Sequence, residues 1–263
     1  MAAMEQAAVP MAGSRRVVDA PTRVLHGVLA VSFIGAWLSA EAEGWRTLHV
    51  TLGYTAGAAV LLRLLWGVWG PRHARLLPRL RPAWGLPVQL LEAARVALGR
   101  ARPAGGASPA SGPAGAAGAS GLRLLGALHA ATVAALLGAT LLTVASGWLN
   151  LQGVSGEAAE ELHEVLGNGM LALVGLHLAG LIAHSVRAGH NRLLAMLTGR
   201  LPGRGPDLVR RNHAGIALVL LAGVAAFGGW RWVQAPDPMV LAYEQQHEHH
   251  RGADPAAAPD EED

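Results

Sequence analysis

Five apolar stretches alternate with polar segments along the chain. They lie at residues 22–40, 47–69, 122–146, 161–186 and 213–233. About 20 mostly apolar residues are enough for a helix to cross the hydrocarbon core of a membrane. The pattern therefore predicts an all-α integral membrane protein with five transmembrane helices.

The polar segments differ sharply in positive charge. All 21 basic residues are arginines, and most of them lie in residues 1–23, 70–123 and 187–211, whereas the two intervening loops contain glutamates. Arginine-rich loops stay on the cytoplasmic side of a membrane. We therefore expect a multi-pass membrane protein with a cytoplasmic N-terminus and an extracytoplasmic C-terminus. The sequence pI near 10.4 then reflects topology and does not indicate nucleic-acid binding.

Three segments outside the apolar stretches have distinct compositions. Residues 84–100 can form a short amphipathic helix on the membrane surface. Residues 101–121 are of low complexity, rich in Pro, Gly, Ala and Ser, and predict a mobile cytoplasmic linker. Residues 234–263 predict a disordered tail. Within this tail, the run HEHH at 247–250 has metal-ligand side chains but nothing that fixes their geometry, so a solvated tail is the better interpretation.

The stretch at 161–186 carries histidines where ionisable residues are rare and usually functional. His163 and His177 are fourteen residues apart. In an α-helix this spacing gives a rotation about 40° short of four full turns and a rise of about 21 Å. They therefore share nearly one face, with one histidine near each side of the membrane. A helix with this spacing can provide one ligand to each of two stacked hemes. The ordinary alternative is that these histidines are polar residues satisfied inside a helix bundle.

The depth of each histidine predicts how the histidines pair. His49 and His163 each lie near the outer side of the membrane, whereas His26 and His177 lie towards the cytoplasm. Each level then has two imidazoles on different helices, as a six-coordinate heme iron requires. Because the chain has no Cys, a covalent heme site is excluded. Any heme would be of the b type.

Four histidine segments resemble those of the bacterial cytochrome b561 family, which is related to the b-type cytochrome subunits of membrane-bound nickel–iron hydrogenases. These segments are RVLHGVL, TLHVTLGY, ELHEVLGN and GLHLAGLIAH, and the likeness also includes RLLWG and NRLLAMLTGR. It runs from about Val18 to Arg200.

The resemblance implies a four-helix transmembrane bundle that holds two b hemes, with the same histidine pairing as the one expected from depth. It also implies electron transfer across the bacterial inner membrane, usually to or from a quinone, with a redox protein as partner. The chain would then divide into a lead-in at 1–21, a cytochrome b domain at 22–200, a fifth-helix region at 201–233 and the tail at 234–263. The fifth helix and the long linker depart from the family pattern, and the resemblance implies no role for them.

Three further residues keep more than one interpretation. His184 shares a face with His177, and by geometry it could be the partner of His26, although the resemblance favours His177. His129 could border a quinone pocket, act as another ligand or make an ordinary polar contact. Arg63 could pair with a heme propionate or extend to the nearby membrane interface.

The sequence thus predicts a diheme electron carrier and leaves open whether it is a quinol or quinone oxidoreductase. One alternative is an anchor subunit of a hydrogenase or another dehydrogenase complex. A second, from a different class, is a transporter or scaffold whose histidines carry protons or a metal ion. The sequence is also compatible with a homodimer.

Overall fold

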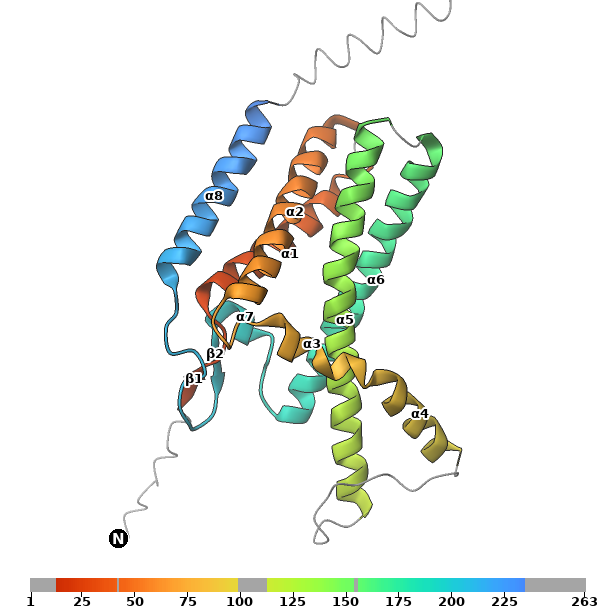
Figure 1. Ribbon diagram of the computed structural model, residues 1–263, viewed down its shortest axis with the longest axis vertical. Coiled ribbons are helices and arrows are strands. Elements are labelled where there is room, and N and C mark those ends of the chain that lie inside the picture. The colour runs from red at the N-terminus through yellow and green to blue at the C-terminus, as the bar shows by residue number, and fades with distance from the viewer. Residues whose placement is uncertain (1–12, 42, 99–112, 154–155, 235–263) are drawn as a thin grey trace, which may run out of the picture.

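The computed structural model (Figure 1) describes residues 13–41, 43–98, 113–153 and 156–234. In chain order the elements are β1 (Ser14–Arg16), α1 (Ala20–Leu38), a 3-10 turn η1 (Glu43–Trp45), α2 (Arg46–Trp69), α3 (Leu76–Trp84), α4 (Leu86–Ala97), α5 (Pro113–Leu151), α6 (Gly156–Ala188), α7 (Leu194–Thr198), β2 (Arg200–Pro202) and α8 (Ala214–Val233).

Five of these helices, α1, α2, α5, α6 and α8, are long and apolar enough to cross a membrane. Each coincides with one of the five apolar stretches, so the predicted all-α membrane class is confirmed. Most of their large apolar side chains are exposed, including Val31 in α1 and Leu218 and Val219 in α8. Exposed apolar faces of this extent suit a lipid environment.

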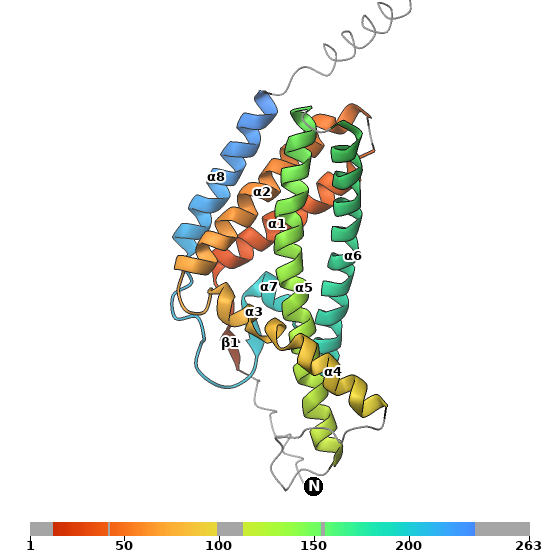
Figure 2. The ribbon, with the colours of Figure 1, turned by 45° about the vertical axis from the view of Figure 1, so that its right-hand side comes forward.

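The bundle is built from two antiparallel helix pairs. α1 packs along α2, α5 packs along α6, and α2 joins the pairs by packing against α5. α8 packs on α1 and α2, on the side of the bundle away from α6 (Figures 1 and 2). The connections α1–α2 and α5–α6 lie at one end of the bundle, which we call the outer end.

Small residues allow the two helix pairs to approach each other closely. A Cβ atom added at Gly57 of α2 would lie 2.9 Å from Cγ1 of Val144 in α5, closer than real side chains come. Close approach at small residues is a common basis of helix packing in membranes. Gly57 therefore helps to set the distance between the α1–α2 pair and the α5–α6 pair.

The opposite end, which we call the inner end, carries the shorter elements α3, α4, α7 and a two-stranded sheet (Figure 1). β1 pairs antiparallel with β2, with Arg15 opposite Leu201. Just before the sheet, Gly199 has a φ of 75°, and its carbonyl accepts the N–H groups of Val17 and Val18. The sheet thus ties the segment before α1 to the segment after α6, although they are far apart in the sequence.

The structure contains β1, β2 and α7, which were not predicted, and it differs from the sequence prediction in two further places. α5 begins at Pro113, so its first turns occupy part of the predicted linker at 101–121; this part is alanine-rich, and alanine has the highest helix propensity. The predicted amphipathic helix at 84–100 is present as α4, but α3 precedes it and was not predicted. The rest of the linker and the tail at 234–263, apart from Gln234, lie outside the described residues.

Because α8 is a fifth span and the arginine-rich segments lie at the inner end, we predict that the C-terminus is outside the cytoplasm. Alkaline phosphatase fused after Asp263 should be active. The matched control is a chain cut after Arg211, before α8, where the same reporter should be inactive and a green fluorescent protein should fluoresce. A fluorescent fusion after Asp263, together with an inactive phosphatase fusion there, would contradict this orientation.

Candidate functional site

The outer end of the bundle brings together His49 of α2 and His163 of α6. Their ring centroids are 5.9 Å apart and their planes are inclined by 79°. Nδ1 of His49 lies 2.8 Å from the carbonyl oxygen of Ala36, and Nδ1 of His163 lies 3.0 Å from that of Thr143. A carbonyl can only accept, so Nδ1 carries the proton in both rings and Nε2 keeps its lone pair. This tautomer is the one that leaves Nε2 free to bind a metal.

Each of these carbonyls belongs to the helix that precedes the histidine's own helix. Ala36 lies near the C-terminal end of α1, where the last carbonyls of a helix have no intrahelical partner. Thr143 lies in α5, and the ring of His163 reaches it over Gly147. A Cβ atom at Gly147 would lie only 2.8 Å from Cε1 of His163. Glycine at this position makes room for the imidazole.

Towards the inner end, His26 of α1 faces His177 of α6. Their centroids are 6.5 Å apart and their planes are inclined by 39°. His129 of α5 stacks on His177, with a centroid distance of 5.1 Å, and its ring also contacts that of His184 at 5.8 Å. The Nδ1 atoms of His177 and His129 are buried and have no hydrogen-bond partner among the described residues. The structure thus brings the ring of His177 next to those of His26 and His129, and that of His184 next to that of His129.

The centroid separations of both pairs, 5.9 Å and 6.5 Å, are compatible with two imidazoles that bind one metal ion. With metal–nitrogen bonds of about 2 Å, the ring centroids of such ligands are roughly 6 Å apart. Among the described helices, α6 packs along α5 and makes few contacts with α1 or α2, so the two pairs span the space between α6 and the α1–α2 pair. The donor atoms and their spacing therefore fit a heme with two axial histidines at each level.

Met170 lies on α6 midway between His163 and His177, seven residues from each, and thus on the same face. It is buried, and its sulfur lies 3.5 Å from the hydroxyl oxygen of Thr140 in α5. The segment between the two pairs is therefore filled by an apolar, polarisable side chain.

Arg63 of α2 is buried at the inner level, and its Nη1 donates to the carbonyl of Ala74 at a distance of 3.4 Å. The charged groups that act on it most strongly are Arg79 and Asp19. Because Ala74 lies in the connection between α2 and α3, this contact directs the guanidinium of Arg63 towards the inner end and is compatible with both roles expected for it.

The sequence analysis missed a buried polar network at the inner end. Asp19 is 1% exposed, and its carboxylate accepts the backbone N–H of Thr22 at 3.3 Å, the indole N–H of Trp66 at 3.0 Å and Nε2 of His73 at 3.2 Å. The ring of His213, at the start of α8, lies 5.6 Å from Trp66 and 6.4 Å from His73 by centroids. An Asp two residues before a Pro is a helix N-cap signal, but its distant partners leave no local pattern.

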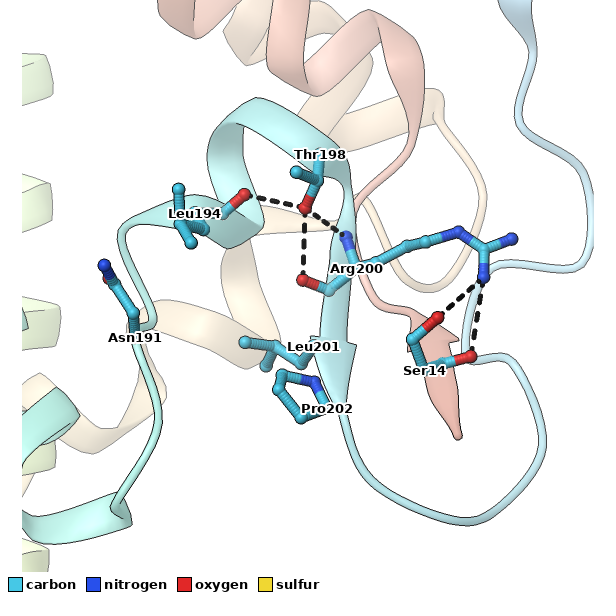
Figure 3. Close-up of a pocket in the computed structure, with 7 residues that line it drawn as sticks. All are labelled: Ser14, Asn191, Leu194, Thr198, Arg200, Leu201 and Pro202. Atoms are coloured by element: carbon cyan, nitrogen blue, oxygen red, sulfur yellow. Dashed lines mark hydrogen bonds between the residues drawn. The ribbon is translucent and has the colours of Figure 1, made fainter. Parts of the chain in front are cut away.

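A surface cavity of about 260 Å³ lies beside the two-stranded sheet (Figure 3). Arg200 borders it, and the guanidinium of Arg200 donates to the hydroxyl of Ser14 at 3.0 Å. None of the paired histidines lines this cavity. It is separate from the histidine site.

The family model described as prokaryotic cytochrome b561 matches residues 17–199. The matched range starts just before α1 and ends after α7, so it contains both histidine pairs, Arg63 and Asp19, but not α8. Comparison with curated proteins and with solved structures gave no match.

Replacing Asp19 by Ala should lower the melting temperature of the detergent-purified protein. The substitution removes the cap of α1 and leaves the half-buried indole N–H of Trp66 without its partner; a fully buried unpaired group costs on the order of 1–3 kcal/mol, which is the upper limit here. Asp207 is a matched control because its carboxylate also accepts a backbone N–H, that of Arg16, but is exposed. Equal losses in Asp19→Ala and Asp207→Ala would contradict a structural role for the buried network.

Proposed function

Because the chain belongs to the prokaryotic cytochrome b561 family, whose members are membrane-embedded b-type cytochromes that transfer electrons, we propose that it holds two b hemes, one at each histidine pair. His49 and His163 would bind the outer iron, and His26 and His177 the inner one. The observation that carries the proposal is that two ring pairs occur at the spacing of bis-imidazole ligands, at the two levels expected from helix geometry. When bound, heme b provides a reversible one-electron couple.

The contacts of His184 support His177 as the inner ligand on α6. The ring of His184 lies beside His129, and the ring that faces His26 is that of His177. His129 would then act on the site through His177, against which its ring is stacked.

The protein's own contribution is to hold, space and insulate the two sites. The carbonyls of Ala36 and Thr143 fix the orientation and tautomer of the outer ligands, as acceptors for metal-bound imidazoles generally do. Fourteen residues on α6 separate the two levels by about 21 Å of rise. Met170 and the apolar helices exclude water between the levels.

The arginine distribution supports an inner-membrane orientation with the inner end in the cytoplasm. Electrons would pass between a quinone pool and a redox protein at one membrane face, by way of both levels. Arg63, buried at the inner level, would pair with a heme propionate.

Purified protein should contain two low-spin b hemes per chain, measured as pyridine hemochrome relative to protein. The reason is that four imidazoles at two levels saturate two irons. A fully loaded preparation with one heme per chain would leave a single functional pair, and one without heme would favour a transporter or scaffold.

Single substitutions should reveal which histidines share an iron. His49→Ala and His163→Ala should remove the same component of an optical redox titration, and His26→Ala and His177→Ala should remove the other. His184→Ala is the matched control on α6 and should keep both components. If His184→Ala removes the inner component while His177→Ala keeps it, the inner ligand on α6 has been misassigned.

A further inference from the structure

The two histidine pairs differ in how their rings are held. At the outer pair, both Nδ1–H groups donate to backbone carbonyls. A buried serine lies three residues after each carbonyl. The hydroxyl of Ser39 donates to the carbonyl of Gly35 at 2.7 Å and lies 3.1 Å from that of Ala36. Oγ of Ser146 lies 3.0 Å from the carbonyl oxygen of Thr143 and 3.1 Å from Nδ1 of His163. The outer pair is therefore anchored twice by the same device, once on α1 and once on α5.

The inner pair lacks this device within the described part of the chain. Nδ1 of His177 is buried without a hydrogen-bond partner, and its ring is held by stacking on His129. The ring of His26 has no hydrogen bond to any described residue. The inner imidazoles are therefore positioned by packing, and the outer ones by hydrogen bonds to carbonyls.

This difference in hydrogen bonding changes how strongly the histidine ligands would donate electron density to the iron. A hydrogen bond from Nδ1–H to a carbonyl makes the imidazole a more basic ligand. A more basic ligand stabilises the ferric state relative to the ferrous state and lowers the reduction potential, which is one of the protein's main means of tuning a heme. By this effect the outer heme has the lower potential.

A buried positive charge at the inner level would widen the same difference in reduction potential between the two hemes. Arg63 lies about 21 Å of helix rise beyond His49 on α2, at the inner level. Its Nη1 donates to the uncharged carbonyl of Ala74, and it forms no ion pair with a carboxylate of the described residues, so its positive charge would act on the inner heme and on the propionate with which it pairs. Positive charge in a medium of low dielectric constant favours the state with one more electron. The inner heme therefore gains potential for a reason independent of the hydrogen bonds.

We infer that the two levels form a potential step, in which the outer heme has the lower reduction potential and the inner heme the higher. Ala36 and Thr143 provide the carbonyl acceptors for the outer ligands, and Arg63 is a positioning residue that raises the inner potential. This inference rests on the proposed diheme function. Electron transfer from the outer to the inner iron would then be favourable, with one electron lost by the outer ferrous iron and gained by the inner ferric iron.

The order of potentials can be read from the holoprotein by optical redox titration between dithionite and ferricyanide. His163→Ala should remove the component of lower potential, and His177→Ala the component of higher potential. Heme is quantified first in each variant: a wild-type content other than two per chain would count against the diheme proposal itself. Two hemes with the reverse assignment would overturn only the potential step.

Two substitutions outside the ligand set test the separate causes. In Gly147→Ala the new methyl group should displace the ring of His163 from the carbonyl of Thr143. The reduction potential of the low-potential component should therefore rise, while that of the high-potential component stays constant. Gly138→Ala is the control on the same helix, because a Cβ atom there meets nothing within 4 Å, and it should change neither potential. If Gly147→Ala loses the outer heme instead, the remaining component must be the higher one; a remaining lower component overturns the inference.

Arg63→Gln removes the buried positive charge and should decrease the reduction potential of the high-potential component alone. Arg63→Lys keeps the charge, so this potential should stay near the wild-type value. A shift confined to the lower component, or equal shifts of both, would place Arg63 at the wrong level and remove the second argument for the step.

Discussion

An imidazole inside a bilayer has no water to bond its second nitrogen, so its partner must come from the protein. At the outer pair this requirement is met by backbone carbonyls of the preceding helix, 2.8 Å and 3.0 Å from the two Nδ1 atoms. Several other features depend on this contact. α1 must end close to Ala36 to leave its carbonyl available, and Gly147 must lack a side chain for His163 to reach Thr143. Helix lengths and small residues that look like ordinary packing are thus conditions for holding the rings.

The sequence was sufficient to predict the five spans and the histidines that come to face each other. Both predictions rest on regular helix geometry: about 20 apolar residues cross a bilayer, and fourteen residues bring His163 and His177 back to nearly one face. The partners of the rings were beyond sequence reasoning, because Ala36 and Thr143 contribute main-chain atoms that any residue has. The start of α5 was missed because small residues also suit linkers, and the sheet of β1 and β2 because three-residue strands carry no periodic signal.

Helix α8 lies outside the range that matches the family, yet it joins the core at a specific place. The carbonyl of Asn212 accepts the N–H of Ala20, and the ring of His213 packs against Trp66 and His73, which both bond Asp19. His213 has a φ of 51°, an uncommon conformation for a residue other than glycine. The carboxylate of Asp19 therefore joins the cap of α1 to the end of α2, and the start of α8 packs on two of the side chains that bond it. The fifth helix is thereby coupled to α1, the helix that carries His26.

A potential step between the two levels has a consequence set by the membrane. If the arginine-rich inner end faces the cytoplasm, an electron moving inwards travels against the membrane potential, at a cost of about 2.3 kcal/mol for each 100 mV crossed. A lower potential at the outer iron offsets part of this cost, since the electron then moves to the more favourable site. The same step opposes outward transfer, which the membrane potential alone would favour. The anchoring of His49 and His163 and the buried charge of Arg63 would thus together favour reduction of an acceptor at the inner end.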